Sequence, residues 1–223
     1  MKYSVVIPAY NAEETIKECL NSVVAQTMSP TQIIVVDDGS QDDTAKIVGE
    51  YSEFVSLIQQ ENSGPGSATT KGFSHATSPL IATLDADDLW LPDKAEIQLM
   101  HLQQNRELDG VFSHIQSFSK SSAKVSIEQG WLRSTMMIRT KAQQKIGDMI
   151  DPKPYGGEFI GWMGRAREMG SQFDMLPVCL ALRRIRQGSL SYGKSKPLVS
   201  GYLQIAREAI LRKKQNKQTR SKP

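Results

Sequence analysis

Runs of apolar residues alternate with polar loops through the first hundred residues of the chain. These runs predict strands at 3–7, 32–36, 55–58 and 81–84. Apolar positions at helical spacing between them predict helices around 16–24, at 43–51 and at 68–75. Pro8 is expected to end the first strand, and Asn11 with Glu14 has the spacing of a capping box for the first helix.

This order of strands and helices is typical of parallel βαβ units, so we expect an α/β fold with a mostly parallel central sheet flanked by helices. Ligands of such sheets bind beyond the carboxyl ends of the strands. The segments at those ends are Pro8–Asn11, Asp37–Ser40 and Asp85–Asp88. Three polar segments at one edge of one sheet predict a single site.

The pattern is weaker after residue 106. We expect strands at 111–118 and 131–138, a polar loop at 120–124 and an extended segment at 173–185. We expect helices at 141–146, 158–169 and 202–211. The chain then divides into three predicted parts, residues 1–108, 109–196 and 197–223.

The segment 81–93 has the most informative chemistry. A strand-like run ends in three carboxylates within four residues, Asp85, Asp87 and Asp88. Extended backbone points side chains two residues apart to the same side, so Asp85 and Asp87 can share a ligand. Oxygen ligands suit Mg²⁺ or Mn²⁺, which commonly bridge a carboxylate to a phosphate. The alternative is a solvated acidic turn before a helix opened by Pro92.

Composition is that of an ordinary globular protein, with 39% hydrophobic and 23% charged residues among 223. Cys19 and Cys179 lie in apolar runs, which favours core packing and is compatible with a reducing cytosol. No stretch has the roughly 20 apolar residues that cross a bilayer, and the first strand begins too early for a signal peptide. We therefore expect a cytoplasmic protein.

Charge is concentrated in residues 207–223, the basic run, which has seven Lys or Arg and one Glu. Such a run binds polyanions or an anionic membrane surface, which is one alternative function. Aromatic residues do not interleave with the basic ones there, so no nucleic acid is expected. A peripheral contact with the inner face of a membrane remains a hypothesis. A nucleotidyltransferase is disfavoured, because the first strand is not followed by a Gly-rich basic loop.

With these elements in order, the chain resembles the family-2 glycosyltransferases, inverting enzymes of the GT-A fold that use nucleotide sugars. The matching segments are SVVIPAYNAEETIKECLNSVVAQT, IIVVDDGSQDDTAKIV, NSGPGSATTKGFSHATSPLIATLDADDLWLP and YGGEFIGWMGRAREMG. The resemblance implies inverting transfer of a sugar from a nucleoside diphosphate sugar, with a UDP-linked donor expected. The acceptor would be a glycan, a lipid or a peptide. Residues 1–108 would bind the donor and 109–196 would form a smaller acceptor-side lobe.

The resemblance also implies roles for individual residues in binding the donor. The nucleotide-binding loop would be Pro8, Ala9, Tyr10 and Asn11. Asp38 would accept the imide N–H of a uracil-like base, although Asp-Asp-Gly-Ser is also an ordinary tight turn. Asp87 would bind the divalent cation, Mn²⁺ or Mg²⁺, and Asp85 would hold the ribose or complete the metal site. Asp88 is expected to start the following helix.

Glu158 is the candidate general base, because many relatives have an acidic pair at this place. Here Phe159 stands where the second acid would be. The alternative is an acid at a helix N-terminus that is worth a few tenths of a kcal/mol. Trp90 and Trp162 are expected to be core residues.

Two departures from the family pattern affect the predicted activity. Thr69 and Thr70 stand where relatives usually have Arg-Asn, and Lys71 could partly replace that arginine at the diphosphate. Arg186 stands where relatives often have His; it could pair with phosphate oxygens but could not ligate a cation. The alternative is an eroded protein that binds nucleotide without transferring sugar.

Overall fold

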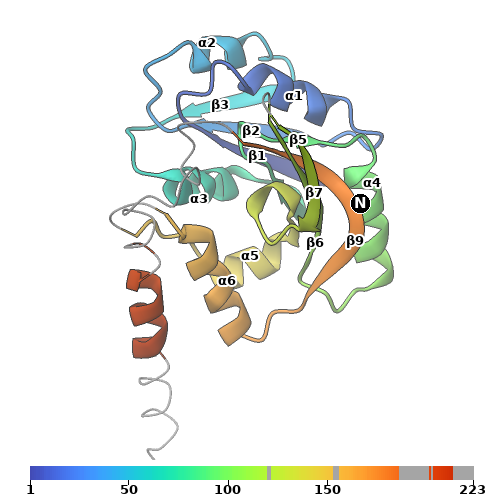
Figure 1. Ribbon diagram of the computed structural model, residues 1–223, viewed down its shortest axis with the longest axis vertical. Coiled ribbons are helices and arrows are strands. Elements are labelled where there is room, and N and C mark those ends of the chain that lie inside the picture. Colours follow the sequence, from blue (N-terminus) through green and yellow to red (C-terminus); the bar gives the residue numbers. More distant parts are fainter. Residues whose placement is uncertain (120–121, 153–155, 186–200, 202, 213–223) are drawn as a thin grey trace, which may run out of the picture.

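The computed structural model of the chain describes residues 1–119, 122–152, 156–185, 201 and 203–212. It contains a nine-stranded sheet with helices on both faces, which confirms the expected α/β fold (Figure 1). The strand order is β3-β2-β1-β4-β8-β6-β9-β5, and β7 pairs with β6.

The first half of the sheet is parallel. Its strands are β1 (Tyr3–Ala9), β2 (Gln32–Asp37), β3 (Val55–Gln59) and β4 (Leu80–Thr83). The expectation that Pro8 ends β1 is wrong, because Pro8 pairs with Val36 and the strand continues to Ala9. β4 pairs with β1 only as far as Val6, so the missing N–H of Pro8 faces a side without a partner strand and costs no ladder bond.

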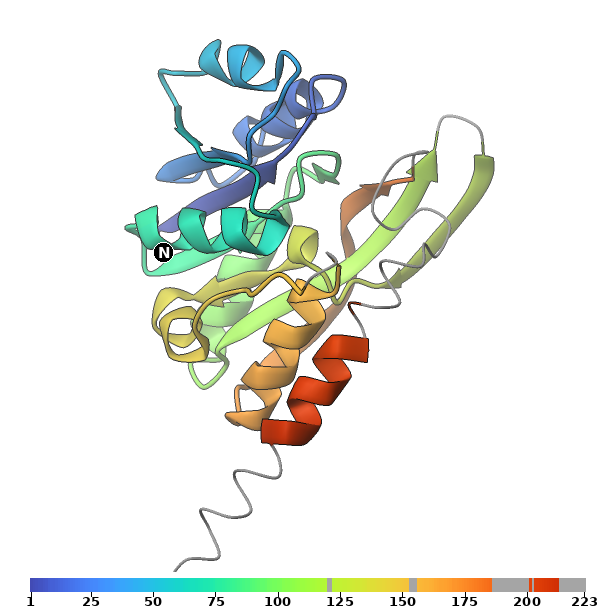
Figure 2. The ribbon, with the colours of Figure 1, turned by 90° about the vertical axis from the view of Figure 1, so that its left-hand side faces the viewer.

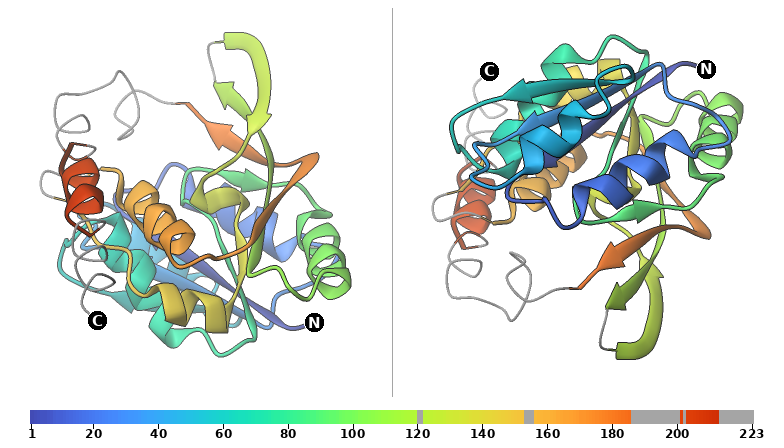
Figure 3. Two further views of the ribbon diagram at one scale, coloured as in Figure 1. Left: turned by 90° about the horizontal axis from the view of Figure 1, so that it is seen from below. Right: turned by 90° about the horizontal axis from the view of Figure 1, so that it is seen from above.

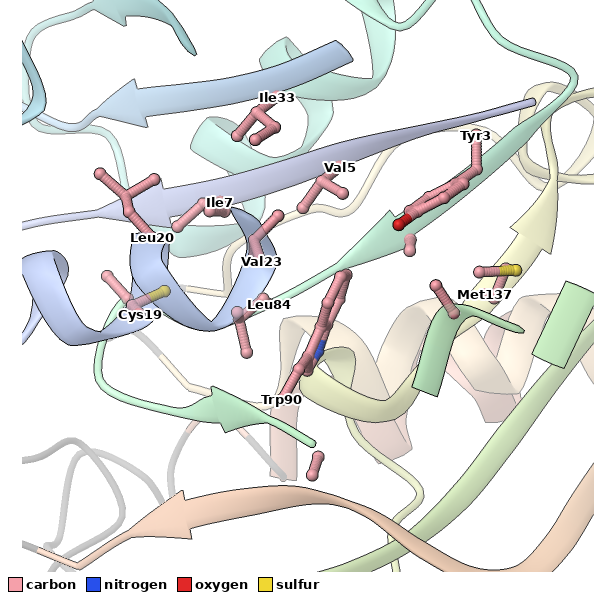
Figure 4. Packing of buried hydrophobic residues seen from close by; sticks show 14 of the residues in the cluster. Tyr3, Val5, Ile7, Cys19, Leu20, Val23, Ile33, Leu84, Trp90 and Met137 are labelled. Carbon is pink, nitrogen blue, oxygen red and sulfur yellow. The ribbon is translucent and has the colours of Figure 1, made fainter. Parts of the chain in front are cut away.

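Helices cover the two faces with separate hydrophobic cores. One face carries α1 (Ile16–Val24), α2 (Thr44–Gly49) and α4 (Lys94–Gln104), and the other carries α3 (Pro65–His75), α5 (Thr140–Ile146) and α6 (Glu158–Glu168). Alternating side chains of β1 serve both cores: Val5 and Ile7 face α1, whereas Val6 faces α3. Figure 4 shows the first core, with Leu20 and Val23 of α1 beside Ile7 and Val5 of β1 and with Trp90 in the lower part of the view.

Two helix starts differ from the expectation. α1 begins at Ile16 after a turn in which the N–H groups of Thr15 and Ile16 both donate to the carbonyl of Ala12, so Asn11 does not cap it. α3 begins at Pro65, three residues earlier than expected. Proline is favoured in the first turn because its missing N–H would have no intrahelical partner there.

The second half of the sheet is mixed. Its strands are β5 (Leu89–Trp90), β6 (Gly110–Ser119), β7 (Ser122–Gln129), β8 (Met137–Arg139) and β9 (Phe173–Arg184). β8 runs antiparallel to β4 and joins the two halves, while β6 is parallel to β9. The sheet therefore crosses the predicted division at residue 108, and β6 with β7 extends away from the parallel half as a long arm (Figure 2).

Two elements of this half were wrongly predicted. Residues 122–124 of the expected polar loop belong to β7, and the expected strand 131–138 is a 3₁₀ turn, η1 (Arg133–Thr135), followed by the short β8. Polar residues of η1 interrupt the apolar alternation, which is the physical reason that a continuous strand does not form.

Residues 203–212 form a helix that lies beside α6 (Figures 2 and 3). Ile205 packs on Gly161 of α6, and the Nε atom of Arg212 is 3.0 Å from Glu168 Oε2. Throughout the described residues, no helix is both long enough and apolar enough to pass through a bilayer.

Candidate active site

The carboxyl ends of β1, β2 and β4 lie at one edge of the parallel sheet. β1 and β2 pair as far as Ala9 and Asp37, and the next backbone N–H, that of Asp38, donates to the carbonyl of Ala9 at 2.8 Å. β4 runs parallel to β1 and ends two residues before Asp85. The segments expected to form one site therefore leave the sheet on the same side.

Asp38 holds the loop that leads into α3. Its Oδ1 accepts hydrogen bonds from Gln60 Nε2 at 2.7 Å and from the Ser63 N–H at 2.9 Å, and its Oδ2 accepts one from the Gly64 N–H at 2.9 Å. The side chain is buried. A carboxylate has about four acceptor positions, so one more donor can be accommodated. The tight-turn alternative thus describes part of its role, and recognition of a base stays a prediction.

In the predicted nucleotide-binding loop 8–11, the first two residues are buried in β1, whereas Tyr10 is 49% exposed. Asn11 has a positive φ of 46°, and its N–H donates to Ser40 Oγ at 2.9 Å. Its side-chain oxygen accepts the Gln41 N–H at 2.8 Å. Asn11 therefore ties the end of β1 to the end of β2, and Tyr10 is the aromatic side chain that this loop presents to solvent.

Arg133 joins a carboxylate of the segment after β4 to one at the start of α6. Its Nε donates to Asp85 Oδ1 and its Nη1 to Glu158 Oε1, each at 2.8 Å. The side chains are 12%, 28% and 9% exposed for Arg133, Asp85 and Glu158, so both ion pairs are shielded from water. The pKa of Arg133 is raised, because the attraction of Asp85 and Glu158 outweighs the effect of burial.

The turn η1 fixes the position of Arg133. The carbonyl of Arg133 accepts the Thr83 hydroxyl at 2.7 Å. Ser134 donates from Oγ to Asp88 Oδ2 at 2.5 Å, and its carbonyl accepts Trp90 Nε1 at 2.7 Å. The same Oγ accepts the backbone N–H of Asp85 at 3.2 Å. η1 is thus bonded to both sides of the acidic segment 85–88.

Asp88 is a buried carboxylate rather than a helix cap, since α4 begins only at Lys94. Burial and the charges of Asp85 and Asp87 raise the pKa of Asp88 to about 8. Arg184 of β9 supports this segment: its backbone N–H donates to Asp88 Oδ1 at 3.0 Å, and its Nε donates to the carbonyl of Asp87 at 3.0 Å. The expectation that Asp88 starts the next helix is therefore wrong.

Asp151 connects the loop before α6 to the N-terminus of α3. Its two carboxylate oxygens accept the N–H groups of Gly66 at 2.9 Å and Ser67 at 2.6 Å. A Cβ at Gly66 would lie 2.8 Å from Asp151 Oδ2, so the contact requires glycine. Burial raises the pKa of Asp151, and the neighbouring charge of Glu158 acts in the same direction. The loop before α6 is thereby anchored to α3, and Glu158 is the first residue of α6.

The residues that depart from the family pattern differ in their surroundings. Thr69 is fully buried and bonds within its own helix, and the Thr70 hydroxyl accepts the Met149 N–H at 2.9 Å. Both threonines are therefore structural. Lys71 is exposed on α3, and Arg186 lies outside the described residues. The assignments of Lys71 and Arg186 to the diphosphate stay predictions.

Aromatic residues behind Glu158 belong to the core. The ring of Phe159 stacks on Trp162 at 6.1 Å between centroids and meets Phe112 edge-on at 6.1 Å. Trp162 and Trp90 are buried, which confirms their expected core roles. An acid in place of Phe159 would be buried in this cluster, so Glu158 is the acidic group that this turn of α6 supplies.

The residues fit a divalent cation that is shared with a substrate. Among the described residues, no group of three or more His, Cys, Asp or Glu side chains could hold a metal ion alone. Asp85 and Asp87 are only partly buried, and the charge concentrated here raises the pKa of Asp88. Mg²⁺ sites of one or two carboxylates completed by phosphate oxygens have this character. Asp85 and Asp87 would hold such a cation.

The sequence analysis missed Arg133, Ser134, Asp151 and Arg184. The polar triplet Arg133-Ser134-Thr135 within an apolar run was a signal for a turn. Asp151 precedes a proline in a turn-rich loop, which does not indicate a contact with α3. The contacts of Arg133 with Asp85 and Glu158 span 48 and 25 residues along the chain, a separation that local patterns do not cover.

The structure is that of an α/β protein with carboxylates gathered at one edge of a mostly parallel sheet. The family model for glycosyl transferase family 2 matches residues 4–157, and the chain belongs to that family. An uncharacterized glycosyltransferase of Rickettsia prowazekii is 36% identical over 193 residues, covering 77% of this chain and 60% of the relative. One of Nostoc sp. is 38% identical over 119 residues, covering 52% of this chain and 37% of the relative.

Solved structures agree with the GT-A fold. The crystal structure of S. aureus TarS 1-349 in complex with UDP-GlcNAc has a TM-score of 0.70 and 22% identity, and the match covers 87% of this chain and 62% of that one. A complex of the same protein with UDP has a TM-score of 0.68. The chain thus spans less than two thirds of the length of these relatives, and the likeness to TarS concerns the fold alone.

Proposed function

We propose that the chain transfers a sugar from a UDP-linked donor to an acceptor hydroxyl or amine, with inversion at the anomeric carbon. The observation that carries this proposal is the pair Asp85 and Glu158, which two 2.8 Å bonds hold on one guanidinium beside the edge of the parallel sheet. A donor-side carboxylate and an acceptor-side carboxylate lie together there. The fold similarity to TarS, which was crystallised with UDP and UDP-GlcNAc, favours the UDP-linked donor.

In the proposed reaction, the acceptor oxygen or nitrogen attacks the anomeric carbon from the face opposite the diphosphate. The new bond to the anomeric carbon forms as the bond from that carbon to the phosphate oxygen breaks, and the electron pair leaves with the diphosphate. Glu158 takes the acceptor proton as general base. Asp85 and Asp87 would hold Mn²⁺ or Mg²⁺, which neutralises charge on the leaving group when bound.

The nucleotide is proposed to lie along the ends of β1 and β2. Tyr10 would contact the base, and Asp38 would use its remaining acceptor capacity for the imide N–H. Lys71 and Arg186 are assigned to the phosphates on charge alone. The acceptor is a glycan, a lipid or a peptide, and residues 109–196 are proposed to form its site.

A thermal-shift screen of nucleotide sugars with and without Mn²⁺, on the native chain and on Asp87→Ala, tests this function. One UDP-sugar is expected to raise the melting temperature of the native chain with Mn²⁺ by several degrees, and the rise should vanish in Asp87→Ala. Stabilisation by a donor without any transfer or hydrolysis would instead identify an eroded nucleotide-binding protein. The absence of stabilisation by every donor would contradict the proposal.

A second candidate function, contact with an anionic membrane surface, is favoured by the helix 203–212. Leu203, Ile210 and Leu211 are 55–57% exposed, and the basic run begins within this helix at Arg207. Apolar side chains flanked by lysine and arginine are typical of helices that lie on anionic bilayers. This contact would bring the site close to a lipid acceptor.

A further inference from the structure

We propose that Arg133 is an internal counter-cation of Asp85 that gives up this carboxylate when a divalent cation and the donor diphosphate bind. Before that exchange, Arg133 holds Asp85 and Glu158 together; after it, the guanidinium stays with Glu158 alone. The inference rests on the proposed function, since it concerns the same donor site. It adds a positioning residue that links donor binding to the candidate base.

The first argument is the competition for one carboxylate. Arg133 donates to Asp85 Oδ1 at 2.8 Å, the distance of a charge-assisted hydrogen bond. A cation that binds Asp85 would use oxygens of the same carboxylate. It would also place a second positive charge next to the guanidinium. The bound cation and the guanidinium would repel each other, because both are positively charged. The carboxylate of Asp85 therefore cannot bind the Arg133 guanidinium and a divalent cation equally well at the same time.

The second argument is that the backbone of Arg133 is fixed while its side chain has a second partner. The carbonyl of Arg133 accepts the Thr83 hydroxyl, and the following residue, Ser134, is bonded to Asp88 and Trp90. η1 therefore stays in place when a ligand arrives. The Nη1 bond to Glu158 retains the guanidinium when Nε leaves Asp85, so the exchange exposes no unpaired buried charge.

The third argument is the local charge. Asp85, Glu158 and Asp151 all act electrostatically on Arg133. Asp87 lies two residues after Asp85, so a second carboxylate remains for an incoming cation after Arg133 has turned to Glu158. The guanidinium thus balances part of the negative charge in the free protein, and the exchange lets a divalent ion replace it.

Mn²⁺ binding in the presence of UDP, measured by electron paramagnetic resonance, tests the exchange without reference to turnover. Arg133→Gln removes the competing charge and keeps hydrogen-bond donors, so it should bind Mn²⁺ about 3- to 10-fold more tightly than the native chain. Arg133→Lys should change Mn²⁺ affinity less than Arg133→Gln does, because lysine retains the positive charge although it does not reproduce the planar set of donors. Damage to the site alone would weaken Mn²⁺ binding instead.

Arg139→Gln is the matched control. Arg139 is also partly buried, but it donates to the backbone carbonyls of Leu108 at 2.8 Å and Leu102 at 2.7 Å rather than to a carboxylate. This variant should lose thermal stability while its Mn²⁺ affinity is unchanged. Equal or weaker Mn²⁺ binding by Arg133→Gln, relative to the native chain, would overturn the inference. Failure of the native chain to bind Mn²⁺ at all would overturn the proposed metal site itself.

A measurement on the native chain avoids any folding defect of the variants. The Nε–H of Arg133 is buried against Asp85 and should give a protected NMR signal. Its chemical shift should change when Mg²⁺ and UDP are added together and not when UDP is added alone. A signal that keeps its position in the Mg²⁺·UDP complex would contradict the exchange.

Discussion

Asp38 combines a structural task with a proposed recognition task, and the two can be separated by substitution. Its carboxylate oxygens accept three hydrogen bonds from the loop at 60–64, two of them from backbone N–H groups. Asp38→Asn presents an NH₂ group to one of these donors. A buried donor left unpaired costs about 1–3 kcal/mol, so the free energy of unfolding in urea should fall by that amount.

Asp43→Asn is the control for this prediction, since Asp43 is exposed and pairs only with Lys46 in α2. Its unfolding free energy should stay within about 0.5 kcal/mol of the native value. UDP binding, measured by calorimetry, should weaken in Asp38→Asn and not in Asp43→Asn. An Asp38→Asn variant with native stability and native UDP affinity would contradict both the structural role and the proposed binding role of Asp38.

Glu158 is the residue whose substitution should separate binding from chemistry. Glu158→Gln keeps an oxygen to accept Arg133 Nη1 but cannot take a proton. Transfer should fall by about 10²- to 10⁴-fold while donor binding changes little. Glu168→Gln, at the other end of α6 and paired with Arg212 at 3.0 Å, should keep native turnover. Turnover of Glu158→Gln within a few fold of native would place the base elsewhere.

Lys94 is fully buried at the start of α4, where Nζ donates to Gln98 Oε1 at 2.7 Å and lies 4.1 Å from the centroid of the Trp90 ring. Burial lowers the pKa of Lys94 well below its ordinary value of about 10.4. Below that value the unfolded chain binds a proton that the folded chain binds less readily. Stability should therefore rise as pH increases towards about 10 and fall as pH decreases.

Urea unfolding of the native chain and of Lys94→Met between about pH 6.5 and pH 9.5 checks this sign. The native chain should gain stability relative to Lys94→Met as pH rises. Lys46→Met, at an exposed position in α2, should show no such trend. A difference between native and Lys94→Met that is constant across the range would mean that Lys94 keeps its proton with equal ease in both states.

Some residues of the candidate site could be predicted from the sequence, and others could not. Asp38, Asp85 and Asp87 follow predicted parallel strands, and strand ends of one sheet meet at one edge. Arg133 lay in a segment expected to be a strand, so its side chain had no assigned direction. Its partners come from the segment after β4 and from α6, and only the packing of both halves of the sheet brings them together.

Among the helices, α3 makes the tightest contact with the sheet, and glycine permits it. A Cβ at Gly72 would lie 2.2 Å from Val6 Cγ1 in β1, so Gly72→Ala forces the helix or the strand to move. Overpacking of this kind costs about 1–3 kcal/mol, which urea unfolding should show. Because α3 carries the loop that Asp38 and Asp151 hold, donor binding should weaken as well.

Gly164→Ala in α6 is the opposite case, since nothing lies within 4 Å of a Cβ at that position. Alanine in a helix interior is favoured over glycine, so this variant should gain about 0.5–1 kcal/mol. Gly72→Ala thus reports on packing against β1, whereas Gly164→Ala reports on helix propensity alone. Similar effects of both variants on stability would contradict the close approach of α3 to β1.

The elements of the parallel half were predicted well, and those of the mixed half less so, for a physical reason. Strands buried on both faces are continuous apolar runs, which the sequence displays directly. β7 lies on a projecting arm and β8 has only three residues, so neither carries a long periodic signal. The pairing of β8 with β4 is also set by contacts distant in sequence.

At the scale of the whole protein, both halves of the sheet contribute residues to the candidate site. Asp38 and Asp85 follow strands β2 and β4 of the parallel half, whereas Asp151 and Glu158 lie between β8 and β9 of the mixed half. Arg133 and the anchor of Asp151 on α3 connect them. The predicted division at residue 108 thus falls within one sheet, and the contacts across it hold Glu158 near Asp85.

The helix 203–212 extends this arrangement towards a surface. It packs on α6, the helix that begins with Glu158, and turns Leu203, Ile210 and Leu211 to solvent. If this face contacts an anionic bilayer, removal of residues 213–223, which include five Lys or Arg, should weaken binding to phosphatidylglycerol vesicles at least 10-fold. Binding should also weaken as salt is raised, because the charge attraction is screened.

Substitutions within the described helix test the apolar part of the same contact. Ile210→Ser with Leu211→Ser should reduce sedimentation with phosphatidylglycerol vesicles, since each buried apolar side chain contributes about 1.5–3 kcal/mol. Phe54→Ser is the matched control, because Phe54 is 63% exposed in the turn before β3, remote in sequence from this helix. Vesicles of neutral phosphatidylcholine should bind none of the variants well. Equal sedimentation of the double variant and the control would contradict a membrane contact through this helix and leave transfer to a water-soluble acceptor as the better proposal.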